Sequence, residues 1–159
     1  MTLYRFLASK NPLEEVRSNA FQQVPLCEFK KIKDFPKSSF YFRLPHEKET
    51  VIYVEDNSKI GQLEIIKCHK VPQYVGSQIQ RPYVYQMHGD MSEHCLTQLL
   101  TYIHEHVSEE DKVEIWSIWH GEKVNSNQIK RMRPQNITLT DLVMLKANEN
   151  SCIKLFPKI

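Results

Sequence analysis

The stretch that says most about the fold is residues 83–120, which read YVYQMHGDMSEHCLTQLLTYIHEHVSEEDKVEIWSIWH. Aromatic and β-branched residues dominate 83–88 and 113–120, and this composition predicts two strands. Between them, apolar residues recur every three or four positions over 91–107, which predicts an amphipathic helix. A strand, a helix and a strand in this order usually place the two strands parallel in one sheet. The predicted apolar stripe of the helix consists of Leu96, Leu99, Leu100, Ile103 and Val107.

Each of these two strands ends in a His-Gly-acid triplet, at 88–90 and at 120–122. Glycine ends strands because it accepts positive φ, and Asp90 is placed to cap the following helix, so local structure can explain both triplets. If the strands are parallel, however, the two histidines lie at one edge of the sheet, where open α/β sheets bind ligands. We therefore also consider a metal site or an acid/base site there. The candidate ligands are His88, Asp90, His120 and Glu122, and the candidate catalytic residues are His88, His120 and Glu122.

The rest of the chain predicts further strands and one more helix. Thr138, with Asp141 at the capping-box position, predicts a short helix over 139–147. Residues 9–39 predict irregular structure with short helices, because prolines interrupt the pattern. The remaining predicted strands are 2–8, 40–44, 50–55, 62–69 and 152–157. The predicted connections are a hairpin loop over 55–61 and long polar loops over 70–82 and 121–137.

These elements predict an α+β fold with a mixed sheet of about five to seven strands. One long and one short helix pack on the sheet, and the C-terminal half runs β-α-β-α-β. The chain has 159 residues, of which 41% are hydrophobic and 25% are charged. That length and composition suit one ordinary core, so we expect a single globular domain over 1–159.

Composition narrows the classes of function. The net charge of +2 is too small to indicate a nucleic-acid binder by itself. The sequence has only four glycines and lacks the glycine-rich loops of common nucleotide sites, so we expect no cofactor. No apolar run is long enough to cross a membrane, and the first residues do not resemble a secretion signal. The four cysteines are widely spaced and are expected to be free thiols, which favours a cytoplasmic protein.

Three hypotheses for function remain open. We favour a non-catalytic protein that binds another protein or its own copy, with Tyr83, Tyr85, Trp116 and Trp119 as aromatic anchors. The alternative role of these rings is core packing. The first rival hypothesis is an enzyme at the edge that carries the two histidines. The second is weak nucleic-acid binding through a basic cluster that consists of Lys130, Arg131 and Arg133.

Overall fold

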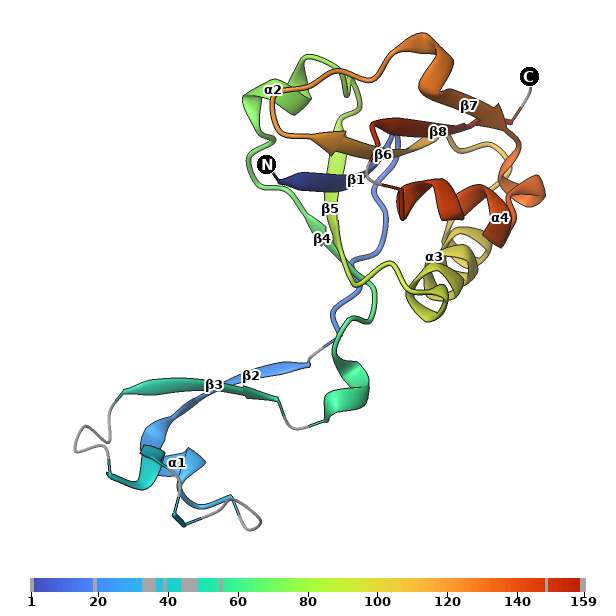
Figure 1. Ribbon diagram of the computed structural model, residues 1–159. Coiled ribbons are helices and arrows are strands. Elements are labelled where there is room, and N and C mark those ends of the chain that lie inside the picture. The colour runs from blue at the N-terminus through green and yellow to red at the C-terminus, as the bar shows by residue number, and fades with distance from the viewer. Residues whose placement is uncertain are drawn as a thin grey trace. The chain divides into compact units, whose positions relative to one another are not determined.

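The computed structural model describes residues 2–18, 20–32, 37–38, 40–43, 49–54, 56–147 and 149–157 (Figure 1). The chain divides into two compact units. Unit 1 comprises Met1–Ser18 and Gly61–Ile159, and unit 2 comprises Asn19–Ile60. Unit 2 is therefore an insertion in the sequence of unit 1. The expectation that residues 1–159 form one domain stays a prediction.

Unit 1 is built on a mixed six-stranded sheet with the strand order β4-β5-β1-β6-β8-β7. β1 is central, and both of its neighbours, β5 and β6, run antiparallel to it. The pair β7 and β8 is parallel, and the remaining pairs are antiparallel. The strands are β1 Leu3–Ser9, β4 Glu64–Lys67, β5 Tyr83–His88, β6 Val113–Trp119, β7 Ile129–Met132 and β8 Ser151–Leu155. The predicted α+β class with a mixed sheet is confirmed.

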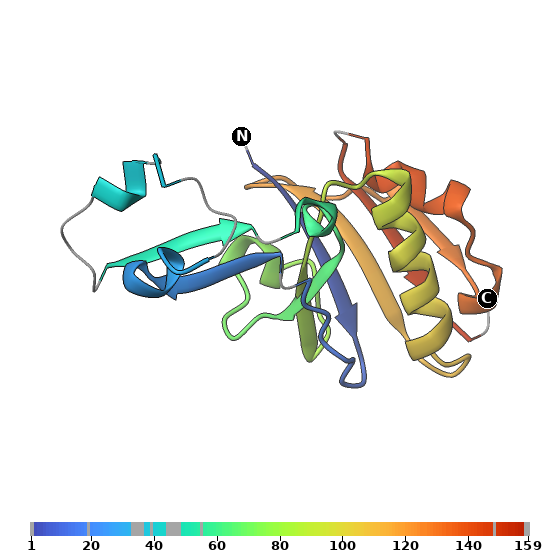
Figure 2. The ribbon, with the colours of Figure 1, turned by 90° about the horizontal axis from the view of Figure 1, so that it is seen from below.

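The two faces of this sheet support two separate cores. Alternation along β1 places Leu7 in the first core and Phe6 and Ala8 in the second. The first core lies under the long helix α3, which follows one face of the sheet in Figure 2. Burying one large aliphatic side chain contributes about 1.5–3 kcal/mol, so the α3 stripe is a main source of stability. The helices of unit 1 are α2 Gln73–Gly76, α3 Glu93–His106 and α4 Leu139–Leu142, with short 3-10 turns η3 Ser126–Gln128, η4 Pro134–Asn136 and η5 Val143–Leu145.

The start of α3 differs from the prediction by two residues. Ser92, rather than Asp90, is the N-cap, and its hydroxyl accepts a hydrogen bond from the backbone N–H of Cys95 at 3.3 Å. Asp90 instead accepts from the backbone N–H of Ser92 at 2.8 Å, which braces the turn before the cap. Either oxygen can satisfy a free N–H at a helix start, so the sequence alone did not separate them. For α4, the predicted capping box of Thr138 and Asp141 is confirmed.

Unit 2 contains a two-stranded antiparallel ribbon, which the sequence did not predict as a pair. β2 is Phe21–Pro25 and β3 is Thr50–Val54. Because β3 pairs with β2, and β4 pairs with β5, the predicted hairpin over 55–61 is wrong. Pairing partners far apart in sequence leave no local signal. The other elements of unit 2 are the helix α1 Leu26–Phe29 and the 3-10 turns η1 Phe40–Arg43 and η2 Asn57–Lys59.

Three further predictions need correction. The strand expected over 40–44 is wrong, since Phe40–Arg43 forms a 3-10 turn. Aromatic residues favour strands only where a neighbouring strand gives them a surface to pack on. The loop expected over 70–82 contains α2, and that expected over 121–137 contains β7. β7 is an edge strand whose two middle residues are an exposed lysine and an exposed arginine. Its sequence therefore lacks the alternation of apolar and polar residues that predicts a strand.

Two serine hydroxyls in the sheet are buried without a hydrogen bond. Ser117 on β6 lies opposite Ser151 on β8, and neither Oγ has a partner in the described chain. A buried hydroxyl without a partner costs about 1–3 kcal/mol. We expect Ser117→Ala to raise the free energy of unfolding by about 1 kcal/mol in urea denaturation. Ser9→Ala is the matched control and should lower it, because the buried Ser9 Oγ accepts from the backbone N–H of Asn11 at 3.1 Å. Equal losses in both variants would contradict this reading.

Candidate functional site

His88 and His120 lie at the same edge of the six-stranded sheet. Since β5 and β6 are each antiparallel to β1, they are parallel to each other, as the sequence predicts. His88 ends β5, and His120 follows β6, where its backbone N–H donates to the carbonyl of Thr2 at 3.0 Å. β1 lies between the two strands, so two strand spacings, about 10 Å, separate β5 from β6 across the sheet, and the register places His120 two residues further along than His88. The histidines share an edge without being neighbours in the sheet.

The surroundings of the two histidines differ. The His120 ring lies 4.4 Å from the ring of Tyr74 and 6.1 Å from that of Tyr4, measured between centroids. These contacts place His120 at the rim of the second core. Burial raises the pKa of Tyr74, so its phenol is neutral. His88 is exposed. The structure therefore gives His120 a packing role and gives His88 none.

The two carboxylates of the triplets are bound to nearby groups. Hydrogen bonds from the side chain and the backbone of Ser92 lower the pKa of Asp90. The side-chain amide of Asn150 donates to Glu122 Oε2 at 2.6 Å. Within the described residues, no group of three or more His, Cys, Asp or Glu side chains could hold a metal ion. The structure thus brings the triplets to one edge but does not assemble their side chains into a ligand set there.

The four predicted aromatic anchors belong mainly to the cores. Tyr85 is 1% exposed, and its hydroxyl accepts from the backbone N–H of Leu13 at 2.8 Å. Trp116 is 3% exposed, and its indole N–H donates to Glu114 Oε2 at 3.1 Å. Tyr83 and Trp119 are half-buried. These burials correct the interpretation of Tyr85 and Trp116 as an exposed patch, because neither ring reaches the surface.

The basic cluster lies on and beside the edge strand β7. Lys130 forms an ion pair with Asp141, and its side chain is 49% exposed. Arg131 and Arg133 flank Met132 and form no ion pair with any described residue. Arg131 is opposite Lys154 in the parallel pairing of β7 and β8. Binding of nucleic acid through this cluster stays a prediction.

The cysteines are poorly suited to nucleophilic chemistry. Cys27, Cys68, Cys95 and Cys152 are all free. Burial raises the pKa of Cys68, Cys95 and Cys152, for Cys152 to about 12. A thiol is reactive only as a thiolate, so these three side chains are inert at neutral pH.

An exposed apolar surface that the sequence analysis missed lies on the ribbon of unit 2. The register pairs Phe21 with Val54 and places Ile52 opposite Gln23, so these side chains share one face. Phe21 is 63% exposed and Ile52 is 66% exposed. The opposite face packs on α1, where the rings of Tyr53 and Phe29 are 5.3 Å apart. We call the exposed side the ribbon face; it consists of Phe21, Gln23, Pro25, Thr50, Ile52 and Val54.

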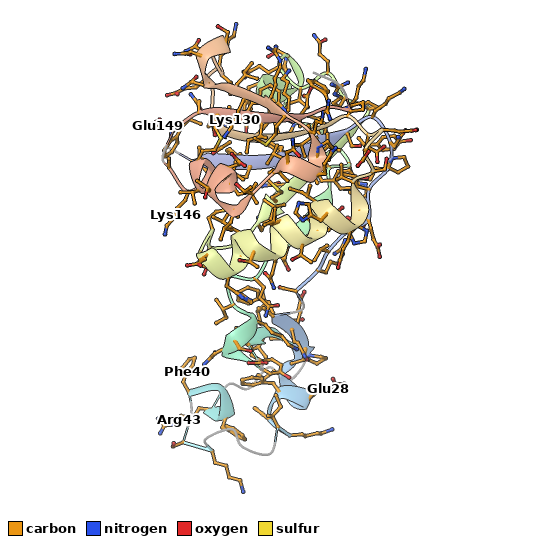
Figure 3. All side chains as sticks on the ribbon, turned by 90° about the vertical axis from the view of Figure 1, so that its right-hand side faces the viewer. Glu28, Phe40, Arg43, Lys130, Lys146 and Glu149 are labelled. Carbon is orange, nitrogen blue, oxygen red and sulfur yellow. The ribbon has the colours of Figure 1, made fainter. Side chains whose placement is uncertain are left out.

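Unit 2 also carries other exposed apolar side chains. Phe40 is 68% exposed and projects from η1 in Figure 3, and Ile60 is 50% exposed. A signal for this surface was present in β3, where Val51 and Tyr53 alternate with Ile52 and Val54. A strand that is apolar on both sides needs two packing partners, but the described part of the ribbon packs on α1 on one side and leaves Phe21 and Ile52 exposed on the other.

Comparison with known proteins gives no relative: no family model matches the chain, and no curated protein or solved structure is significantly similar to it. None of the described helices has the length and apolar character that a membrane span requires.

Proposed function

We propose that this protein is a non-catalytic binding protein that associates with a second copy of itself through the ribbon face. The observation that carries the proposal is the pair of large, mostly exposed apolar side chains on this face, Phe21 and Ile52. Isolated exposed apolar residues are common on protein surfaces. Here two of them share one short strand pair whose opposite face already packs on α1.

The composition of the ribbon face supports a second copy as the partner. None of its six residues is charged. Charged residues are depleted in the centres of protein interfaces. A charged face would also repel an identical face, whereas an uncharged one brings no such repulsion to a two-fold contact. An isolated two-stranded ribbon is marginally stable in water, so covering this face would also stabilise unit 2.

The test is the oligomeric state of the protein and of a double variant, Phe21→Ser with Ile52→Ser. Each side chain is about one-third buried already, so each contributes about 1–2 kcal/mol to association. Because a dimer contains two copies of each side chain, we expect the double variant to weaken the dimer by at least about 700-fold, measured by sedimentation velocity over a concentration series. Both positions are exposed, so circular dichroism should show an unchanged fold.

Val143→Ser is the matched control, because Val143 is a 51% exposed apolar residue on η5 in unit 1. It should leave the dimer unchanged. A wild-type protein that stays monomeric at every concentration would rule out self-association through this face. A dimer that survives the double variant would place the interface elsewhere.

We also propose a cytoplasmic location. The four cysteines are free, and cytosolic conditions keep thiols reduced.

A further inference from the structure

A small polar hollow lies in unit 1, on the face of the sheet that carries the second core. Its volume is about 240 Å³, and it opens between the segment after α2 and the strands β6 and β8. Gln78 fixes one side of it, since its side-chain amide donates to the carbonyl of Glu122 and accepts from the backbone N–H of Val124. The lining residues are Gln78, Gln80, Arg81, Glu114 and Lys154.

Glu114 forms the floor of the hollow and binds three donors. Its side chain is only 5% exposed. Arg81 donates to Oε1 from Nε at 3.1 Å and from Nη2 at 2.8 Å. The Nζ of Lys154 lies 3.5 Å from the same oxygen, and the indole of Trp116 donates to Oε2. The carboxylate is thus saturated, while Arg81 and Lys154 retain N–H groups without a described acceptor.

Positive charge exceeds negative charge around this hollow. The two cations of the lining face one carboxylate. Arg131 adds a third cation, because it lies opposite Lys154 on the neighbouring strand. Burial raises the pKa of Cys152, but Lys154 and Arg131 both act to lower it, and the Cys152 side chain lies on this face of the sheet. Three positive charges against one negative charge leave an excess of two. Arg131 is exposed beside the hollow, whereas Arg81 and Lys154 are largely buried, and buried charges are usually compensated by a partner.

The geometry points to a binding site for a phosphate group, formed by Arg81, Lys154 and Arg131 around the carboxylate of Glu114. A phosphate group carries about 1.5 to 2 negative charges at neutral pH, which is nearer to the excess than the single charge of a carboxylate. Arginine and lysine are the usual ligands of phosphate oxygens. The hollow is smaller than the 300–1,000 Å³ typical of sites for larger organic ligands, so it suits a phosphate ion or the phosphate of a small ester.

The NMR resonance of the Trp116 indole N–H can be used to detect binding, because this group donates to the carboxylate of Glu114 at the centre of the site. We expect its NMR resonance to shift saturably with inorganic phosphate, with a dissociation constant on the order of 1 mM. The variant Trp119→Phe distinguishes it from the second indole. Sodium chloride at the same ionic strength should not reproduce the shift. Glycerol phosphate is titrated in parallel: tighter binding than phosphate identifies an ester as the ligand, and weaker binding identifies the free ion.

Lys154→Gln should weaken phosphate binding at least tenfold, and Arg131→Gln should weaken it to a smaller degree. Lys154 is 21% exposed, so its replacement is expected to leave the fold intact, which the amide spectrum will show. Lys146→Gln is the matched control: this exposed lysine follows η5 and projects away from the sheet in Figure 3. It should bind phosphate like the wild-type protein. No saturation below about 50 mM, an equal response to chloride, or unchanged binding by Lys154→Gln would each overturn the site.

Discussion

Replacing Glu114 by glutamine is expected to lower the free energy of unfolding by about 3 kcal/mol. The change removes the negative charge between Arg81 and Lys154 while it keeps the shape of the side chain. Breaking a buried ion pair costs about 3–5 kcal/mol, because the remaining charge is left without a partner. We expect the lower end of this range, since both cations are 21% exposed and can be partly rehydrated. Urea denaturation monitored by tryptophan fluorescence measures the loss.

Glu15→Gln provides the comparison for this experiment. Glu15 is 40% exposed and lies 3.6 Å from Arg17, which is 61% exposed. Exposed ion pairs contribute little, so the change should stay within about 0.5 kcal/mol. The glutamine can still accept the hydrogen bond that Glu15 receives from the backbone N–H of Lys67. If the two substitutions had the same effect, Glu114 would not be the buried ionic centre described above.

Gly89→Ala is expected to destabilise unit 1 by about 3–4 kcal/mol. Gly89 has φ of +144°, which side chains rarely tolerate, and strain of this kind costs about 1–3 kcal/mol. A Cβ at this position would also lie 2.5 Å from Cys95 Sγ. Cys95 is fully buried, so it cannot turn away, and overpacking a core costs about 1–3 kcal/mol more. Thermal and urea unfolding both measure the effect.

Two controls separate backbone strain from the steric clash at Gly89. Gly121 has φ of +82°, but a Cβ there would meet no atom within 4 Å, so Gly121→Ala should cost only about 1–2 kcal/mol. Combining Gly89→Ala with Cys95→Ala removes the sulfur atom and should recover at least about 1 kcal/mol relative to additive losses. Strictly additive losses would show that the contact with Cys95 does not limit this position.

The part of the fold that the sequence predicted well is the part with local signals. The 3.6-residue spacing of Leu96, Leu99 and Ile103 sufficed to predict α3 and its buried face. The capping box of Thr138 and Asp141 likewise marked the start of α4. Strand order lacked such a signal. The central position of β1, the pairing of β2 with β3, and the edge strand β7 depend on contacts between residues that are distant in sequence.

In the candidate site, too, the features with a local sequence signal could be predicted, and those that depend on distant contacts could not. The pattern around residues 83–120 predicted that His88 and His120 would share an edge, and the strand directions agree. Their separation could not be predicted, because it depends on β1 lying between them. Trp116 is a residue whose type could be read from the sequence but whose role could not. Its aromatic ring suggested an exposed anchor, but the indole instead supports a buried carboxylate that sequence alone did not single out.

The position of unit 2 in the chain allows the inserted segment to vary in length and sequence. At the start of the insertion, Val16 pairs with Ile65, and the backbone N–H and hydroxyl of Ser18 donate to Glu64. The chain segments just before and just after the insertion are therefore hydrogen-bonded to each other. The entropy lost in closing a flexible loop grows only with the logarithm of its length, about 0.6 kcal/mol for each doubling. Segments of very different length can occupy this position at nearly the same free-energy cost, so a new recognition surface can be acquired here while the sheet is left intact.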